Sequence, residues 1–394
     1  MATAFKLGVM SLLLIGWLGA EVACGHDVSP TKVRWRHQSS ARGELPVPGV
    51  GNQQTACVVA DFDGDGRQEF AIAERTASPA IVGYEWEADG WERWIIEPAS
   101  LPIEAGGAVC DINGDGRLDL VLGGDYRSNE LWWWENPGKP FKGPWPRHVI
   151  KSQGANQHHD QLAADFDGDG RPEIVFFNQR ARTLFLAPIP QQPTAQERWQ
   201  LKEVWSWSGP PYEGLARADI NGDGKEDIVG GGYWFKNEGG DRFVPHLIDE
   251  YRSSRCAVGD LIEGDSPEVV LNSGDGVGPL ALYEFRNDRW HQTILVPHVD
   301  HGHTLELGDI NGDGHLDIYA AEMHTPGAGD RCRQWVFYGN GKGRFRAEVI
   351  SLGICNHESR LSDLNGDGRP DIVGKPYTWK APGINVWLNE GPEG

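Results

Sequence analysis

The sequence predicts an all-β fold, a seven-bladed β-propeller built from four-stranded antiparallel blades. Three observations lead to it: an aspartate-rich motif recurs seven times, β-type residues flank every copy, and a segment near the N terminus resembles the strand that the last unit lacks. The seven copies start 50, 54, 54, 41, 49 and 54 residues apart. That spacing is long enough for one four-stranded sheet with its turns.

The motif is complete in six copies and degenerate in one. The complete copies read DFDGDGRQE, DINGDGRLD, DFDGDGRPE, DINGDGKED, DINGDGHLD and DLNGDGRPD, and they begin at Asp61, Asp111, Asp165, Asp219, Asp309 and Asp363. The degenerate copy, DLIEGDSPE, begins at Asp260. Seven copies at this period predict seven structural units.

Each unit carries signals for four strands. A short apolar strand such as CVVAD enters the motif, and a β-rich run such as EFAIAE leaves it. An aromatic third strand such as LWWWENPG and a fourth strand such as WERWIIE follow. Four antiparallel strands in a repeated unit are typical of a propeller blade.

The two ends of the chain predict how the ring closes. The last unit stops at its third strand, INVWLNEG, while residues 33–40 have the pattern of an isolated fourth strand. We therefore expect residues 26–394 to form a single propeller in which the N-terminal strand completes the last blade.

Residues 1–25 read as a signal peptide, with one lysine, an apolar run and small residues before Gly25. The apolar run is shorter than the roughly 20 residues of a membrane-spanning helix, and no later segment approaches that length. The sequence predicts an exported protein, periplasmic or extracellular, without a transmembrane segment. Cys24 is a candidate lipid-attachment site, and Cys332 with Cys355 is the preferred disulfide among the remaining cysteines.

The net charge of −21 argues against a nucleic-acid partner, because phosphate backbones are bound by Lys and Arg patches. The motif offers another explanation for the acidity. Side-chain oxygens at positions 1, 3, 5 and 9, with a carbonyl at position 7, suit Ca²⁺, which accepts six to eight oxygen ligands. An EF-hand is excluded because position 12 lacks its glutamate, and simple Gly-Asp turns do not explain such a density of oxygens.

The sequence therefore predicts about six structural calcium sites. Their expected ligands, with position 7 contributing its carbonyl, are Asp61, Asp63, Asp65, Arg67 and Glu69; Asp111, Asn113, Asp115, Arg117 and Asp119; Asp165, Asp167, Asp169, Arg171 and Glu173; Asp219, Asn221, Asp223, Lys225 and Asp227; Asp309, Asn311, Asp313, His315 and Asp317; and Asp363, Asn365, Asp367, Arg369 and Asp371. The copy at Asp260 has Ile262 and Gly264 at positions 3 and 5, so no metal is expected there.

The pattern D-x-[DN]-G-D-G-x-x-[DE] resembles the FG-GAP or VCBS repeat family, whose blades also form the head of integrin alpha subunits. The resemblance covers residues 48–394 and implies the propeller fold and its calcium loops. Propellers of this type serve as adhesion modules, carbohydrate binders, polysaccharide lyases and sugar dehydratases, so the resemblance does not decide activity. The stretches DHGHTLELGDINGDGHLDIYAAEMH and NHESRLSDLNGDGRPDIVGKPYTW are similar to bacterial propellers related to aldos-2-ulose dehydratase.

The first strand of a propeller blade lines the central channel, so equivalent positions on these strands should form a ring. Six residues before the first loop aspartate, the seven units carry Thr55, Ala105, His159, Glu213, Ser254, His303 and His357. Charged and aromatic residues flank this ring, namely His158, Asp160, Tyr212, Arg217, Arg255, His301 and Glu358. Glu322 and His324 follow the second strand of the sixth unit and are expected near the same channel mouth.

Several functions of this ring are open from the sequence. Three imidazoles and a carboxylate suit Zn²⁺ or another transition metal. Without a metal, a His or Tyr212 could remove a proton beside a carbonyl while Arg217 or Arg255 stabilises the enolate, as in a lyase or dehydratase. The alternative is a purely structural role, in which these residues bind ordered water and cap backbone groups. The candidate catalytic set is His159, Tyr212, Glu213, Arg217, Arg255, His303 and His357.

The sequence thus favours a secreted calcium-binding propeller that binds a saccharide or other extracellular ligand at the channel mouth. The alternative is a carbohydrate-active carbon-oxygen lyase, and adhesion to an extracellular protein is a third hypothesis.

Overall fold

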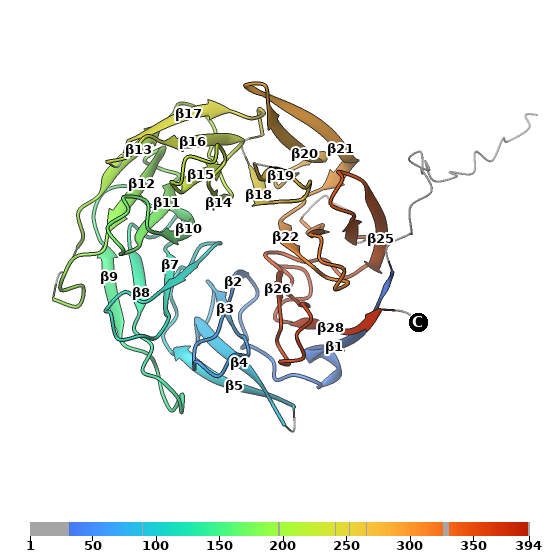
Figure 1. Cartoon of the computed structure of the whole chain (residues 1–394). Coiled ribbons are helices and arrows are strands. Elements are labelled where there is room, and N and C mark those ends of the chain that lie inside the picture. Colours follow the sequence, from blue (N-terminus) through green and yellow to red (C-terminus); the bar gives the residue numbers. More distant parts are fainter. Residues whose placement is uncertain are drawn as a thin grey trace, which may run out of the picture.

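The structure, a computed structural model, describes residues 31–88, 90–195, 198–240, 242–251, 253–264, 266–325 and 331–392. The predicted signal peptide and Cys24 lie outside the described residues. Seven four-stranded antiparallel sheets stand as blades around a central axis (Figure 1). Helix is confined, within the described ranges, to a 3-10 turn at Ser40–Arg42. The predicted seven-bladed all-β fold is confirmed.

Each of the first six blades is formed by four consecutive strands. Blade 1 contains β2 (Gln54–Ala60), β3 (Glu69–Glu74), β4 (Ile81–Glu87) and β5 (Gly90–Glu97). Blade 2 contains β6 (Ala108–Cys110), β7 (Asp119–Gly123), β8 (Leu131–Trp134) and β9 (Arg147–Lys151). Blade 3 contains β10 (His158–Ala164), β11 (Glu173–Asn178), β12 (Thr183–Pro188) and β13 (Lys202–Ser206).

The next three blades repeat this order. Blade 4 contains β14 (Leu215–Ala218), β15 (Asp227–Gly230), β16 (Tyr233–Asn237) and β17 (Phe243–Leu247). Blade 5 contains β18 (Ser254–Gly259), β19 (Glu268–Ser273), β20 (Val277–Arg286) and β21 (Arg289–Asp300). Blade 6 contains β22 (Thr304–Gly308), β23 (Asp317–Ala321), β24 (Arg333–Gly339) and β25 (Phe345–Leu352).

The seventh blade joins the two ends of the chain. It contains β26 (Arg360–Ser362), β27 (Asp371–Gly374) and β28 (Asn385–Pro392), and its outer strand is β1 (Val33–Ser39). Strands β1 and β28 are antiparallel, with Arg36 opposite Leu388 (Figure 1). The predicted closure of the ring by the N-terminal strand is confirmed.

The core lies between neighbouring blades. On β8, Trp132 and Trp134 point into the cluster shared with blade 1, whereas Trp133 points into the cluster shared with blade 3. All three side chains are buried. Because strand side chains alternate between faces, a run of three tryptophans serves two interfaces at once.

The direction of the first strands fixes where functional groups lie. Each first strand ends at its aspartate loop, so the residues at its beginning lie at the opposite end of the channel. Strands β2, β10, β14, β18, β22 and β26 surround the axis in Figure 1. The aspartate loops and the predicted histidine ring therefore occupy opposite ends of the propeller.

The disulfide between Cys332 and Cys355 is present, as predicted. Among the described residues, Cys57, Cys110 and Cys256 are free thiols. No helix within the described part of the chain is long and apolar enough to cross a membrane.

Candidate functional site

The aspartate loops of blades 1 and 3 gather carboxylates at short range. One oxygen each of Asp61, Asp63 and Glu69 lie within 4.8 Å of one another, and the same holds for Asp165, Asp167 and Glu173. Closely spaced carboxylate oxygens are the ligand set that a hard divalent cation prefers. These two loops fit such a cation.

Backbone hydrogen bonds hold the loops in shape. In blade 1, Asp61 accepts from the N–H groups of Gly64 (2.7 Å) and Gly66 (3.0 Å), and Asp65 accepts from that of Arg67 (2.9 Å). Gly64 and Gly66 have φ angles of 77° and 92°, which favour glycine. The first aspartate of the other five complete loops accepts in the same way from the glycine five residues later.

The ninth position of the loop carries a buried carboxylate. Burial, with the nearby Asp63 charge, raises the pKa of Glu69 to about 8, and burial raises the pKa of Asp119 and Asp371 to about 7. A buried carboxylate is costly to charge, and a bound divalent cation would offset that cost.

In the degenerate loop of blade 5, the ninth residue accepts two backbone hydrogen bonds. Glu268 accepts from the N–H groups of Leu261 (2.9 Å) and Ile262 (2.8 Å). Positions 3 and 5 are Ile262 and Gly264, which offer no side-chain oxygen. This loop keeps the turn without the ligand set.

At the other end of the channel, His159 lies between two carboxylates. Its Nδ1 is 2.7 Å from Asp160 Oδ2, and its Nε2 is 3.7 Å from Glu213 Oε1. Burial alone would lower the pKa of His159, but Glu213 and Asp160 outweigh burial and raise it to about 10. His159 therefore carries a proton at neutral pH.

Arg255 reaches across the channel. Its two terminal nitrogens pair with Asp160 of blade 3 and Glu358 of blade 7. Asp160 also accepts from the N–H group of Gly214 (2.7 Å), and Glu358 from that of Gly106 (2.9 Å). This ion-pair network links five blades across the channel.

The two carboxylates of this network stand on unusual backbone. Asp160 and Glu358 have φ angles of 48° and 56°. At the equivalent position, five residues before the loop aspartate, blades 2 and 4 carry Gly106 and Gly214 with φ angles of 101° and 78°. A left-handed conformation in a residue with a side chain costs about 1–3 kcal/mol and concentrates at functional sites. The replacement of glycine by a carboxylate in this repeat position was a sequence signal for the network.

His303, His357 and Tyr377 form a stack beside the network. The His303 and His357 ring centroids are 5.1 Å apart, and those of His357 and Tyr377 are 4.9 Å apart. His303 Nε2 is 3.2 Å from Asp275 Oδ1, and Lys375 Nζ is 3.0 Å from His357 Nδ1. Burial, with the Lys375 charge, lowers the pKa of His357 well below 6.5, so its ring is neutral.

The geometry does not form a zinc site from the three imidazoles. Within the described ranges, the groups of three His, Cys, Asp or Glu ligand atoms that converge are those of the first and third loops. His159 is held by carboxylates and His357 by Lys375. Their ring nitrogens serve these contacts instead of converging on one point.

Two further predicted residues lie outside the ring. The side chain of Tyr212 packs with Trp205, Trp207 and Tyr233 in the aromatic cluster between blades 3 and 4. Arg217 is exposed near the aspartate loop and pairs with Glu226 (3.0 Å). Arg255 is in the ring, but its terminal nitrogens are already paired.

Several buried polar atoms around the channel have no hydrogen-bond partner among the described residues. Among them are Thr55 Oγ1, Glu213 Oε2, Arg255 Nε and His303 Nδ1. A buried polar group left unpaired costs about 1–3 kcal/mol. These atoms belong to residues on first strands or at their beginnings, and they are hydrogen-bonding groups without a protein partner and with almost no exposed surface.

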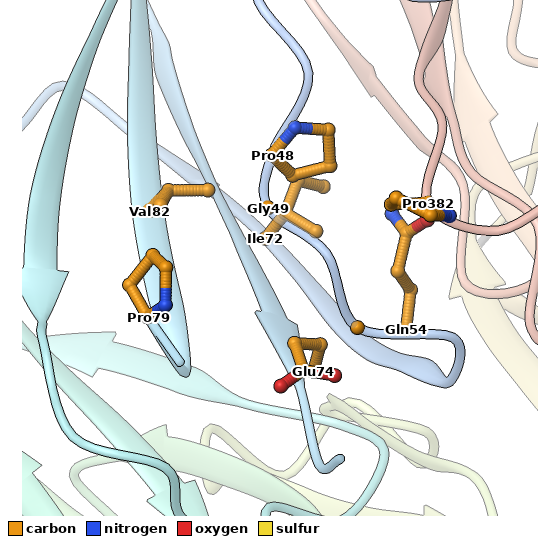
Figure 2. Close-up of a pocket in the computed structure, with 9 residues that line it drawn as sticks. Pro48, Gly49, Gln54, Ile72, Glu74, Pro79, Val82 and Pro382 are labelled. Atoms are coloured by element: carbon orange, nitrogen blue, oxygen red, sulfur yellow. The ribbon is translucent and has the colours of Figure 1, made fainter. Parts of the chain in front are cut away.

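A small cavity at the start of blade 1 offers no alternative site. It is lined by Pro48, Gln54, Glu74 and Pro382, among others (Figure 2), and has a volume of about 10 Å³. This volume is at the lower limit for one water molecule.

The comparisons with known proteins agree with this architecture. Residues 111–176 match the FG-GAP-like repeat. This FG-GAP-like repeat runs from the loop of blade 2 to the second strand of blade 3. The sequence motif predicted a resemblance to FG-GAP propellers. The family match and the seven-bladed fold confirm it.

Curated relatives cover part of the chain. Integrin alpha pat-2 of Caenorhabditis briggsae is 25% identical over 282 residues, which are 66% of this chain and 21% of the relative. Cartilage acidic protein 1 of Homo sapiens is 22% identical over 269 residues, which are 57% of this chain and 40% of the relative. The chain thus spans about a fifth of the integrin and two fifths of the cartilage protein.

A solved structure supports the fold over nearly the whole chain. BBS1N in complex with ARL6DN aligns with a TM-score of 0.56 at 11% identity, covering 90% of this chain and 96% of that chain. At this identity the likeness concerns the fold alone.

Proposed function

We propose that the protein is an exported calcium-binding propeller that binds a saccharide at the channel end opposite its aspartate loops. One observation carries the proposal: buried polar atoms of Thr55, Glu213, Arg255 and His303 lack partners at that end of the channel. A ligand with several hydroxyl groups can both donate to and accept from such a set.

The charges of the ring favour a neutral ligand. His159 and Arg255 are positive, and each is paired with carboxylates of the same network. Tyr377, the partly exposed member of the stack with His303 and His357, adds an aromatic ring nearby. Planar groups beside hydrogen-bonding groups suit the C–H faces and hydroxyl edges of a sugar ring.

Calcium has a structural role in this proposal. The six complete loops lie at the far end of the channel from the ring, so their cations would not contact the ligand. Extracellular calcium modules bind with dissociation constants of roughly 10⁻⁴ to 10⁻³ M. The predicted export, with or without a lipid on Cys24, places the protein where such weak sites would be filled.

A glycan array tests the saccharide proposal. Fluorescently labelled protein, saturated with calcium, should bind a subset of saccharides, and Glu213→Gln should lose that binding because a carboxylate oxygen is replaced by an amide. Glu226→Gln, near the aspartate loops, is the matched control and should bind as the wild type does. An array without binding, or equal binding by Glu213→Gln, would refute the proposal.

A carbon-oxygen lyase or sugar dehydratase is the second candidate. The arrangement of Asp160, His159 and Glu213 favours it, since an imidazole oriented by one carboxylate beside a second can transfer a proton to or from a substrate. Mass spectrometry of a glycan and keto-sugar panel should then show products lighter by one water or cleaved with an unsaturated end. These products should disappear with His159→Gln.

A protein ligand is the third candidate, and the likeness to integrin alpha chains favours it. The array separates this candidate from the first, since a purely protein-directed propeller would bind no saccharide.

A further inference from the structure

A groove beside the channel mouth is walled by two blades. It lies between the end of β21 in blade 5 and the edge of blade 6, and its volume is about 330 Å³. Its lining includes Asp300, Glu322, Met323, Arg333 and Leu352. Small-molecule sites measure roughly 300–1,000 Å³, so this groove suits one compact molecule.

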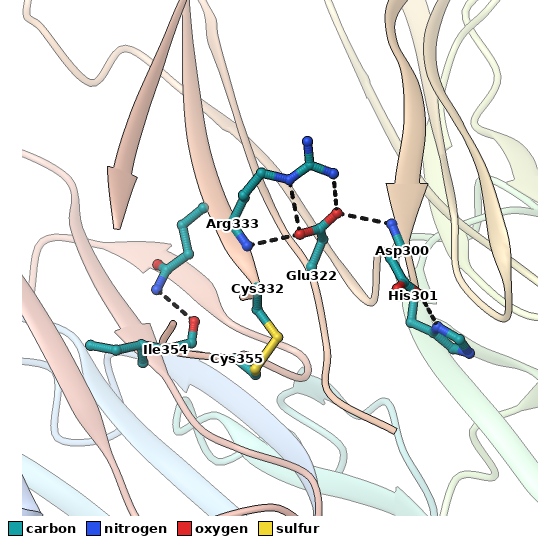
Figure 3. The surroundings of a disulfide bond; sticks show 8 residues. Asp300, His301, Glu322, Cys332, Arg333, Ile354 and Cys355 are labelled. Atoms are coloured by element: carbon teal, nitrogen blue, oxygen red, sulfur yellow. Dashed lines mark hydrogen bonds and ion pairs between the residues drawn. A yellow bond between two sulfur atoms is a disulfide. The ribbon is translucent and has the colours of Figure 1, made fainter. Parts of the chain in front are cut away.

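Glu322 is the fixed centre of the groove wall. It is 3% exposed, and its carboxylate accepts from the backbone N–H groups of Asp300 (2.9 Å) and Arg333 (2.8 Å) (Figure 3). The Arg333 guanidinium donates to both carboxylate oxygens, over 3.1 Å and 2.6 Å. Hydrogen bonds at both oxygens hold this carboxylate in one orientation.

Three further contacts make the wall rigid. Arg333 lies over the Trp335 ring, 4.6 Å from its centroid. Arg333 also donates to the His298 carbonyl (3.0 Å). The disulfide between Cys332 and Cys355 fixes the adjacent backbone (Figure 3). A wall whose polar groups are already in place loses little entropy on binding.

The chemistry of the lining selects a class of ligand. Glu322 and Arg333 neutralise each other, and Asp300 is matched in charge by Arg331. Asp300 lines the groove and pairs through Oδ1 with His301 Nδ1, so its Oδ2 is not used in that contact. Leu352, which is 65% exposed, contributes apolar surface, and Met323 also lines the groove but is 4% exposed.

We propose that this groove is a second binding site, which takes a single neutral sugar residue. The apolar surface of Leu352 would contact its C–H face, and Asp300 and Arg333 its hydroxyl groups. The groove differs from the channel ring, so the proposal does not depend on ligand binding at Glu213 or His303.

The chain contains a built-in probe of this groove. It has three methionines, at positions 1, 10 and 323, so Met323 is the one methionine of residues 26–394. With ¹³C-labelled methionine methyl groups, the Met323 resonance reports on the groove directly. Titration with the methyl glycosides of glucose, galactose and mannose should shift this resonance saturably with at least one of them.

Two variants separate the groove from the ring. Asp300→Asn, at a partly exposed position, should weaken the response about tenfold or more, which corresponds to the loss of about 1.4 kcal/mol. Glu213→Gln should leave it unchanged even if it abolishes binding at the channel. In the absence of ligand, a Met323 methyl resonance at the same chemical shift as in the wild type shows that each variant is folded.

Three results would overturn the proposal. The first is the absence of a shift with all three glycosides, and the second is an undiminished response of Asp300→Asn. The third is a response confined to glucuronate or to glycine, which would assign the groove to an acidic or a zwitterionic ligand.

Discussion

Arg255 and Glu358 form an ion pair across the propeller channel, although 103 positions separate them in the chain. The second arm of Arg255 pairs with Asp160, so one guanidinium joins blades 3, 5 and 7. Both carboxylates stand on left-handed backbone, at the repeat position where blades 2 and 4 have glycine. The network therefore ties together the first strands of several blades beside the ring residues.

Removing Arg255 should destabilise the fold strongly. Arg255→Ala removes the guanidinium that pairs with two buried carboxylates, and breaking a buried pair in this way costs about 3–5 kcal/mol. Urea unfolding at neutral pH and saturating calcium measures the change. The triple variant Arg255→Ala, Asp160→Asn, Glu358→Gln should recover part of the loss, and a cost below about 1 kcal/mol for Arg255→Ala would contradict the role of the network.

The protonation of His159 should make stability fall at alkaline pH. Its pKa is raised to about 10 in the folded protein, against 6.5 ordinarily. The stabilisation is fully present below pH 6.5 and is lost as the pH rises toward 10. Between pH 6.5 and about 9 the wild type should lose about 3 kcal/mol more than His159→Gln in urea unfolding. Equal losses in the two proteins would show that His159 is not held as a cation.

A complete loop and the degenerate loop should respond differently to the same substitution. Asp165→Asn should remove one bound calcium and, at calcium about 100-fold above its dissociation constant, about 2.7 kcal/mol of stability. Asp260→Asn is the matched control and should change neither quantity. Thermal unfolding with and without a chelator tests this, because the difference for Asp165→Asn should vanish once calcium is removed.

Asn237 should prove important for the contact between blades 3 and 4. Its buried side chain donates to the Phe166 carbonyl of the preceding blade (2.7 Å) and to the Glu226 carbonyl (3.0 Å). Asn237→Ala leaves these carbonyls without that donor and should cost about 1–3 kcal/mol in urea unfolding. Asn340→Ala, at a less buried position, should cost less. Equal effects would contradict the role of Asn237 in joining the two blades.

The sequence predicted the fold well because its signals are local and repeated. Each blade carries its own aspartate loop and strand pattern, and the unpaired third strand at the C terminus required the partner found in β1. The disulfide between Cys332 and Cys355 was also predicted from the sequence.

The channel could be predicted only in part. Register placed His159, Glu213, His303 and His357 at equivalent positions, but it does not determine side-chain direction. Tyr212 turns into the aromatic cluster between blades, and Arg217 pairs near the loops, because packing and local charge decide those orientations. Arg255 pairs across the channel with residues that lie 95 and 103 positions away in the chain. The sequence pattern within one repeat does not specify these pairings.

Elemental mass spectrometry of the purified mature protein, before and after mild chelation, is the most direct test of the calcium-stabilised propeller. The account predicts about six calcium ions per chain, one for each complete loop, and no stoichiometric transition metal. A triple variant of His159, His303 and His357 to alanine should keep the same calcium content. A protein without calcium, or with one zinc that the triple variant loses, would contradict the account.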